Sequence, residues 1–292
     1  MSTLRVLHAA DLHLDSPLSG LDRYEGAPVE RLRGATRRAF SNLVDFCVEE
    51  EVKLLLIAGD LYDGNWRDYS TGLFFVGEMA RLREAGVRVV WIRGNHDAAS
   101  KLTKHLRLPE NVRELPYRSA GSVVFEDWGV AVHGRGYPEP HVTEDLVRDY
   151  PAPHSGLLNF GLLHTALDGR VGHEPYAPCS LRTLLDRGYD YWALGHVHTR
   201  EVLHENPWVV FPGNLQGRQL RESGSKGATL ISVDGASIAR VEHVALDVVR
   251  WAFVAVDVAE AANPDDVLEL VSRELARAAQ EAEGRLVAAR VA

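Results

Sequence analysis

Five segments of the chain share one design, an apolar run that ends abruptly in side chains able to bind metal ions. Continuous apolar runs of this length, rich in branched and aromatic residues, predict strands that are buried on both faces of a sheet. The segments are LRVLHAADLH (4–13), VKLLLIAGD (52–60), VRVVWIRGNHD (87–97), FGLLHT (160–165) and YDYWALGHVH (189–198). Such strands predict an α/β fold in which the five polar ends meet at the carboxyl edge of the sheet.

Helix-like stretches lie between these strands. Residues 29–51 place apolar side chains close to a 3.6-residue period, and residues 71–86 and 180–188 do the same, the last two ending at a glycine that suits a helix C-cap. From about residue 205, short strands joined by glycine-containing turns predict a β-rich stretch that completes a second sheet. Residues 251–291 predict a compact β-α-β unit.

The strand ends supply side chains of the kinds that hard or borderline divalent cations prefer, namely carboxylate, imidazole and amide groups. The predicted metal ligands are Asp11, His13, Asp60, Asn95, His164, His196 and His198. Residues i and i+2 of an extended segment face the same way, so the Asp-x-His and His-x-His pairs should each point two ligands into one site. Asp60 is the natural bridge, because one carboxylate can bind two ions. A single histidine at a strand end, such as His164, is more often a core residue. The prediction therefore depends on the occurrence of all five polar strand ends together.

His96 lies between Asn95 and Asp97 in the GNHD motif. If Asn95 binds a metal, the His96 side chain points toward substrate, where it can protonate the leaving oxygen or stabilise charge in the transition state. Asp97 is predicted to orient His96 through its second ring nitrogen. The predicted catalytic residues are therefore His96 and Asp97. Asp63 closely follows a ligand position, and either supports the site or belongs to a turn.

Composition limits the class of protein. The 292 residues suffice for one large domain with an appendage, and no apolar run approaches the roughly 20 residues of a membrane helix. The N-terminus lacks the regions of a signal peptide, and Cys47 and Cys179 are too few for a disulfide framework, so the expected compartment is the reducing cytoplasm. Among the remaining side chains, His105 and His173 have no ligand-like setting. Trp66 is expected in the core, although its place after the GDLYDG loop also allows exposure.

The formal net charge of −9 is unusual for an enzyme that binds nucleic acid, because phosphate contacts normally leave a basic footprint. Metal-binding carboxylates are counted as bare charges here, and bound cations would neutralise several of them. Alternatively, the substrate is small, or a partner protein supplies the basic surface. Net charge alone leaves these interpretations open.

The ordered motifs D-x-H, GD, GNHD, a later histidine and GHxH resemble the calcineurin-like metallophosphoesterase superfamily over roughly residues 4–215. This resemblance implies a four-layer αββα sandwich, in which two mixed sheets are flanked by helices. It also implies two divalent metal ions, with Asp60 bridging them and His96 catalytic. The ligands carried over for metal one are Asp11, His13, Asp60 and His198. Those for metal two are Asp60, Asn95, His164 and His196.

Within the superfamily the chain most resembles the bacterial DNA repair exonucleases of the SbcD class, in particular the YhaO-like branch. The residues behind this narrower resemblance are LHAADLHLDSPL, GDLYDG, RGNHDAASK, GLLHTALDG, YDYWALGHVH and FPGNLQGRQLRES. One departure from the archaeal and eukaryotic members is Asp63, where those enzymes tend to carry a histidine; we interpret it as a branch marker. The resemblance implies a nuclease domain over residues 1–248 and the start of a cap domain, incomplete, over residues 249–292.

Three functions follow as hypotheses. The first is a manganese-dependent DNA exonuclease, with endonuclease activity as an extension, that forms a homodimer and works with a coiled-coil ATPase of the SMC type, as the resemblance implies. The second is a small-molecule phosphodiesterase or phosphatase, which the acidic charge favours. The third is a metal-bound module without activity that tethers DNA to an ATPase, which the incomplete cap favours. Faster turnover of small phosphoesters than of DNA would favour the second hypothesis over the first. Binding of two metal ions without any hydrolysis would favour the third.

Overall fold

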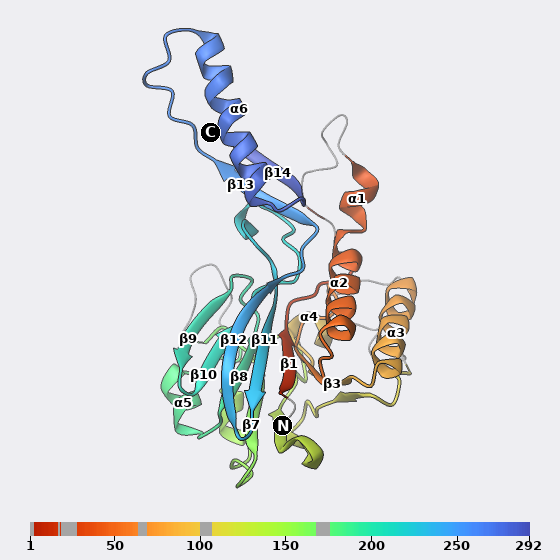
Figure 1. Cartoon of the computed structure of the whole chain (residues 1–292). Helices are drawn as coiled ribbons and strands as arrows, with labels where there is room; N and C mark the ends of the chain where they lie inside the picture. The colour runs from red at the N-terminus through yellow and green to blue at the C-terminus, as the bar shows by residue number, and fades with distance from the viewer. Residues whose placement is uncertain (1–2, 17, 19–27, 64–68, 100–106, 168–175) are drawn as a thin grey trace.

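The computed structural model of the chain describes residues 3–16, 18, 28–63, 69–99, 107–167 and 176–292 (Figure 1). Three positions discussed above, Trp66, His105 and His173, lie outside the described residues. The five strands predicted from the apolar runs are all present, and they are distributed over two sheets of six strands each.

The first sheet contains the strands that begin the chain. In spatial order it consists of β12 (Ser237–Ala245), β11 (Gly227–Asp234), β1 (Leu4–Ala9), β2 (Leu54–Ala58), β3 (Arg88–Ile92) and β4 (Val112–Glu114). Strands β1 to β4 run parallel, whereas β11 pairs antiparallel with β1, and β12 antiparallel with β11. Helices α2 (Ala35–Glu49) and α3 (Tyr69–Glu84) connect the parallel strands, as crossovers between parallel strands require.

The second sheet also has a parallel centre, but both of its edge strands are antiparallel. In spatial order it consists of β5 (Gly121–Phe125), β6 (Val130–Gly134), β7 (Leu158–His164), β8 (Tyr191–Gly195), β10 (Trp208–Phe211) and β9 (Glu201–Glu205). Only part of the stretch beyond residue 205 joins it. The prediction that this stretch completes the second sheet is therefore wrong for β11 and β12, because the long strand β11 pairs with the edge of β1 instead.

The two sheets face each other and enclose the central layer of the core. Alternation along β2 shows how the layers arise, since successive side chains of a strand point to opposite faces. Leu54 and Leu56 face the second sheet, whereas Leu55 and Ile57 face helices α2 and α3. A third cluster around Trp192 covers the outer face of the second sheet and includes residues of the short helix α5 (Leu181–Asp186). These layers confirm the predicted αββα sandwich.

The helix expected over residues 29–51 is divided at Gly34 into α1 (Val29–Arg33) and α2. A further short helix, α4 (Asn95–Ala99), begins at the GNHD motif, and single 3-10 turns η2 (Glu126–Trp128), η3 (Leu146–Asp149) and η4 (Leu220–Glu222) connect other elements. Among the described residues, no helix is both long enough and apolar enough to cross a membrane.

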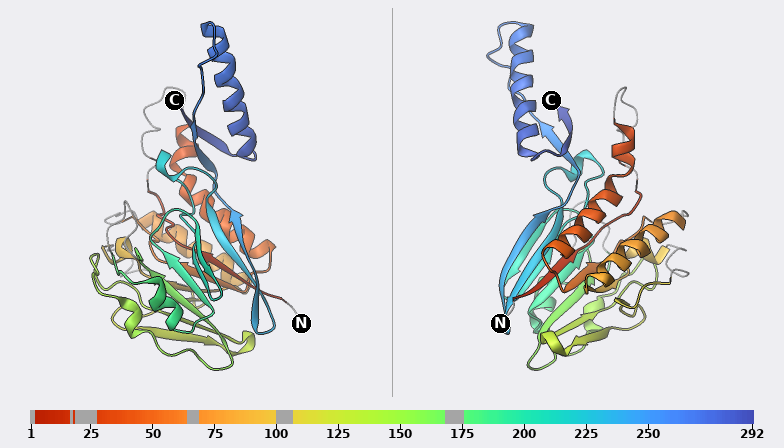
Figure 2. Two further views of the ribbon diagram at one scale, coloured as in Figure 1. Left: turned by 90° about the vertical axis from the view of Figure 1, so that its left-hand side faces the viewer. Right: turned by 45° about the vertical axis from the view of Figure 1, so that its right-hand side comes forward.

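The predicted β-α-β unit is present as β13 (Val249–Val254), α6 (Pro264–Glu281) and β14 (Leu286–Val291). Its two strands pair in parallel, and the unit extends away from the two sheets (Figures 1 and 2). Trp251 and Val249 anchor it through a small apolar cluster with Leu32 of α1 and Ala35 of α2. We refer to residues 249–292 as the C-terminal unit, and to the part before it as the sandwich.

Candidate metal centre

The carboxyl ends of five parallel strands deliver the predicted ligands to one place. Strands β1, β2 and β3 of the first sheet lead to Asp11, Asp60 and Asn95, and β7 and β8 of the second sheet lead to His164 and His196. The loops after β1 and β2 are joined by backbone hydrogen bonds, from Asp11 N to Gly59 O and from His13 N to Asp60 O, both 3.0 Å. This pairing holds two ligand-bearing loops side by side, beyond the end of the sheet.

The backbone at the ligands is not extended, contrary to the basis of the i and i+2 prediction. Asp11, His13, Asp60 and His196 have φ angles of +51°, +42°, +54° and +99°, in the left-handed region that non-glycine residues rarely adopt. Strained backbone of this kind persists only where the surrounding structure imposes it, and it clusters at functional sites. The two motifs therefore converge because their loops turn left-handed, and not because strand alternation continues.

Two glycines next to predicted ligands are required by close approach. A Cβ atom at Gly94 would lie 2.2 Å from Oδ1 of Asp60, and one at Gly195 would lie 1.9 Å from the carbonyl oxygen of Ala58. Both distances are far shorter than any van der Waals contact. The absence of a side chain at these positions thus allows the loops of the two sheets to meet around Asp60.

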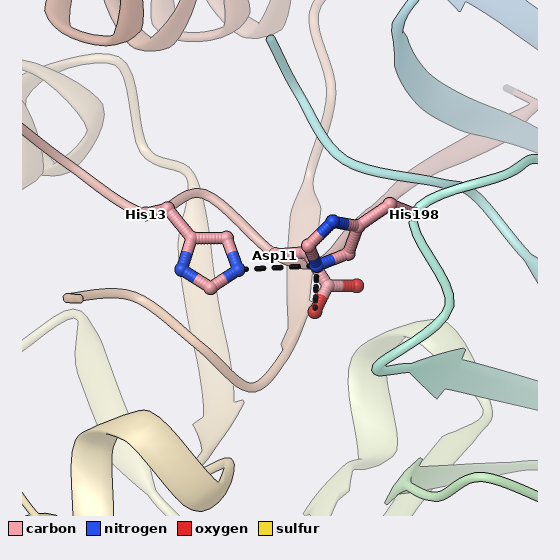
Figure 3. Close-up of side chains that lie close together, drawn as sticks. All are labelled: Asp11, His13 and His198. Carbon is pink, nitrogen blue, oxygen red and sulfur yellow. Dashed lines mark hydrogen bonds and ion pairs between the residues drawn. The ribbon is translucent and has the colours of Figure 1, made fainter. Parts of the chain in front are cut away.

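The first cluster of donor atoms comprises Asp11, His13 and His198 (Figure 3). Nε2 of His13 lies 3.2 Å from Nε2 of His198, which in turn lies 3.8 Å from Oδ1 of Asp11. Asp60 adjoins this cluster, with its Oδ2 atom 3.9 Å from Nε2 of His13. Asp11 and His13 are almost completely buried. The four side chains predicted for metal one therefore surround one point.

The second cluster forms on the other side of Asp60. Nε2 of His164 lies 3.4 Å from Oδ2 of Asp60 and 3.0 Å from Oδ1 of Asn95. The ring of His196 lies 5.2 Å from that of His164, centroid to centroid, and the backbone N–H of His196 donates to the carboxylate of Asp11. Asp60 thus lies between the two clusters, as a bridging ligand must.

The tautomers show that this donor set fits cations. Nδ1 of His164 lies 2.9 Å from the carbonyl oxygen of Ala58, to which it must donate its proton. In a neutral ring, the Nε2 lone pair then faces the oxygens of Asp60 and Asn95, an arrangement that is repulsive unless a proton or a cation lies between them. The paired Nε2 atoms of His13 and His198 present the same problem. Two divalent ions would resolve both, with ligands of the expected chemistry.

Electrostatics reinforce this picture. Burial opposes ionisation of Asp60, but the charge of His164 and its hydrogen bond outweigh burial and hold the pKa of that carboxyl well below its usual range. Burial lowers the pKa of His13 to about 3, so its ring is neutral and able to act as a ligand. Burial opposes the charged form of His164 as well, yet Asp60 raises its pKa to about 9. The carboxylates of the centre therefore favour a positive charge at Nε2 of His164, which either a proton or a cation can supply.

The His96 side chain lies beside the donor atoms at the border of solvent, 39% exposed. Its ring is 5.0 Å from that of His13, and its backbone N–H donates to Oδ1 of Asp60. Nδ1 of His96 lies 3.0 Å from Oδ1 of Asp63, and this hydrogen bond raises the pKa of His96. Asp63 also lies 3.6 Å from Nδ1 of His13 and accepts a hydrogen bond from Ser16. Asp63 is therefore the partner of His96.

The prediction that Asp97 orients His96 is wrong. The carboxylate of Asp97 accepts hydrogen bonds from the backbone N–H groups of Leu61, Tyr62 and Gly94 instead, at 3.0–3.2 Å. Burial and the charge of Asp60 raise the pKa of Asp97 to about 7. Asp97 is completely buried in α4, where it fastens the loop after β2 to the loop after β3.

Two further side chains reach the centre from the segment after β10. Glu222, at the end of η4, is buried and lies 2.8 Å from Nδ1 of His198. Arg218 donates to Ser16 and lies 3.7 Å from Asp63. Neither Arg218 nor the carboxylate of Glu222 is among the site residues predicted from the sequence. No periodic pattern distinguishes this carboxylate from others of the chain.

Comparison with known proteins identifies the class. The family model of calcineurin-like phosphoesterases matches residues 4–200, and the model of the middle domain of metallophosphoesterase YhaO matches residues 251–292. The chain belongs to the calcineurin-like phosphoesterase family.

Among its relatives, the uncharacterized metallophosphoesterase YhaO of Bacillus subtilis (strain 168) is 36% identical over 275 residues, which cover 93% of this chain and 67% of that protein. The DNA double-strand break repair protein Mre11 of Sulfurisphaera tokodaii is 26% identical over 264 residues, which cover 85% and 64%. The chain thus spans about two thirds of the length of these relatives. A solved structure, TT1561 of Thermus thermophilus, aligns with a TM-score of 0.46 at 14% identity, covering 84% of this chain and 100% of that one.

Proposed function

We propose that this protein is a manganese-dependent phosphodiesterase that hydrolyses DNA, as an exonuclease with additional endonuclease activity, in DNA repair. The observation that carries the proposal is the pair of donor clusters on either side of Asp60, with His96 beside them. Two-metal sites of this kind stabilise the attacking and leaving oxygens of an in-line displacement at phosphorus. The relative named as a DNA double-strand break repair protein favours DNA over other phosphodiesters.

Each side chain has a role in this proposal. Asp11, His13, Asp60 and His198 would hold one ion and Asp60, Asn95, His164 and His196 the other, and the ions would supply charge neutralisation and an activated water. His96 donates its proton from Nε2 to the leaving oxygen, while Asp63 accepts from Nδ1 and thereby keeps the ring protonated and oriented. We propose that Arg218, which lies 3.7 Å from Asp63, contacts a phosphate of the substrate.

The rest of the proposal concerns partners and organisation. We propose residues 1–248 as the nuclease domain and residues 249–292 as part of a cap that positions DNA. We also propose a homodimer and a coiled-coil ATPase partner, on the resemblance to the SbcD class, and a cytoplasmic location, on the small number of cysteines and the character of the N-terminus. The chain spans about two thirds of the length of these relatives. Its action on duplex DNA therefore depends on whether residues 249–292 suffice to position DNA.

A nuclease assay with two substrates tests the proposal. Linear duplex DNA and the small diester bis-p-nitrophenyl phosphate are incubated with Mn²⁺ and with wild type, His96→Ala or His154→Ala. His96→Ala should reduce hydrolysis of DNA about 10²- to 10⁴-fold, which is the usual contribution of a general acid. His154 is an exposed histidine whose ring stacks on His133, before the start of β7 and away from the centre, so its replacement is the matched control.

Undiminished DNA degradation by His96→Ala would contradict the assigned role of His96. Rapid hydrolysis of the small diester without any hydrolysis of DNA would favour a small-molecule phosphodiesterase instead. Binding of two Mn²⁺ ions without turnover of either substrate would favour the tethering module.

A further inference from the structure

A buried carboxylate outside the predicted ligand set holds one of the proposed ligands. Glu222 is only 6% exposed, and its Oε1 atom lies 2.8 Å from Nδ1 of His198. An ionised carboxylate accepts hydrogen bonds and cannot donate them. The proton of a neutral His198 ring is therefore on Nδ1, and the lone pair is on Nε2.

The orientation of His198 gives this contact its significance. Figure 3 shows one ring nitrogen of His198 directed at His13 and Asp11, and the other directed away from them. The first is Nε2, which lies 3.2 Å from His13 and 3.8 Å from Asp11. Glu222 thus fixes the tautomer in which the lone pair faces the position proposed for metal one. A carboxylate hydrogen-bonded to an imidazole also fixes the orientation of the ring.

Glu222 is itself held from behind by two donors. Its Oε2 atom accepts from Nδ2 of Asn214 at 2.9 Å and from the backbone N–H of Arg218 at 2.7 Å. With His198, three donors converge on one carboxylate. A glutamine cannot make the same contacts, because its NH₂ group would face either the Nδ1–H of His198 or the N–H groups of Asn214 and Arg218. The site is built for a carboxylate.

The segment that carries Glu222 is also fastened to the C-terminal unit. The Gln216 side chain accepts from the backbone N–H of Val248 at 2.9 Å and donates to the carbonyl oxygen of Val249 at 2.7 Å. Trp251 of β13 donates from Nε1 to the carbonyl oxygen of Gly217 at 2.9 Å. Residues 214–222, which we call the bridging segment, therefore connect β13 with His198.

We propose that Glu222 is a positioning residue for His198, and that the bridging segment makes this positioning depend on the seating of the C-terminal unit. This inference rests on the metal centre of the proposed function and extends it beyond the ligands. It gives the C-terminal unit an influence on metal one, because the bridging segment contacts His198, a ligand proposed for that ion and not for the other.

The test is a Mn²⁺ titration of the full chain by calorimetry, with wild type, Glu222→Gln and Glu78→Gln. Glu78 is an equally buried carboxylate that accepts from Ser41 and Arg81, remote from the centre, so it is the matched control. Wild type should bind two ions. Glu222→Gln should weaken one of them about 10- to 100-fold, as loss of such a partner usually does, and leave the other unchanged, whereas Glu78→Gln should change neither.

A second readout does not depend on metal binding. Nitrogen-15 spectra of the histidine rings in the metal-free protein report which nitrogen of His198 carries the proton, with His198→Gln as the assignment control. Wild type should show the Nδ1–H form, and Glu222→Gln should lose it. If wild type and Glu222→Gln bind two ions equally well, this inference is overturned but the proposed function is not. Failure of wild type to bind Mn²⁺ would overturn the proposed function, and the inference with it.

Discussion

The sandwich and the C-terminal unit contain the same kinds of elements but differ in how they are stabilised. Every residue of β2 in the sandwich is buried, whereas α6 in the C-terminal unit has no buried residue along its whole length. Burial of apolar surface is the main source of folding free energy. The difference indicates that the sandwich maintains the geometry of the metal centre, and that the C-terminal unit is attached by a few contacts around Trp251.

Loss of the bridging carboxylate should have the largest effect and should be confined to the sandwich. Asp60→Asn removes the negative charge that both proposed ions share, so phosphodiester hydrolysis should fall at least about a thousandfold. Hydrogen exchange of α6 should not change. Asp45→Asn, which alters an exposed carboxylate paired with Arg81, is the control and should retain activity. Two ions still bound to Asp60→Asn, measured by metal analysis, would contradict the bridging role.

Acid should weaken the sandwich before the C-terminal unit. His8 is completely buried between Tyr191 and the carbonyl oxygen of Leu194, and burial lowers its pKa from 6.5 to about 3. The unfolded chain binds this proton below pH 6.5 but the folded chain only near pH 3, so stability falls as the pH drops through that interval. The loss reaches up to about 5 kcal/mol for this one group.

Urea unfolding between about pH 8 and pH 4 measures this dependence, and His8→Gln should flatten it. Because residues 249–292 contain no histidine, hydrogen exchange of α6 should respond far less. An unchanged pH dependence in His8→Gln would mean that other groups cause the acid sensitivity.

The attachment of the C-terminal unit depends on Trp251, and its removal should have the next largest effect. Trp251→Ala deletes a side chain that is 7% exposed and should cost about 3–5 kcal/mol of the free energy of unfolding. Leu268→Ala in the same unit, at a position 64% exposed, should cost less than about 0.5 kcal/mol. Denaturant unfolding measures both. Equal costs would show that the cluster around Trp251 does not hold the unit.

The smallest expected effect concerns the start of α6. Asn263 accepts from the backbone N–H groups of Asp265 and Asp266, and the Asp266 side chain accepts in return from the backbone N–H of Asn263 in a capping box. Asn263→Ala should weaken the helix by about 1 kcal/mol. Hydrogen exchange in the first turns of α6 should accelerate, with no change in β2 or in Mn²⁺ affinity. Faster exchange in β2 as well would contradict a local effect.

The sequence predicted the strands well because burial on both faces leaves an unmistakable apolar run, as in residues 52–60. It also predicted which side chains come together, since Asp60 and His164 follow parallel strands in the two facing sheets. The predicted reason was wrong for Asp11 and His13, which reach the centre through left-handed turns. Such turns depend on loop pairing, which a strand pattern does not encode.

By itself, the sequence determined the strands, the types of the proposed ligands and their order along the chain, because these depend on local periodicity and on side-chain chemistry. The four layers were implied by the family resemblance. Only the tertiary structure decided that Asp63 and not Asp97 supports His96, that β11 extends the first sheet, and that Glu222 stands behind His198. Each of these contacts joins residues 24 or more positions apart through loops. Which residues meet in these contacts depends on how the loops pack, and the local sequence around each residue does not encode that packing.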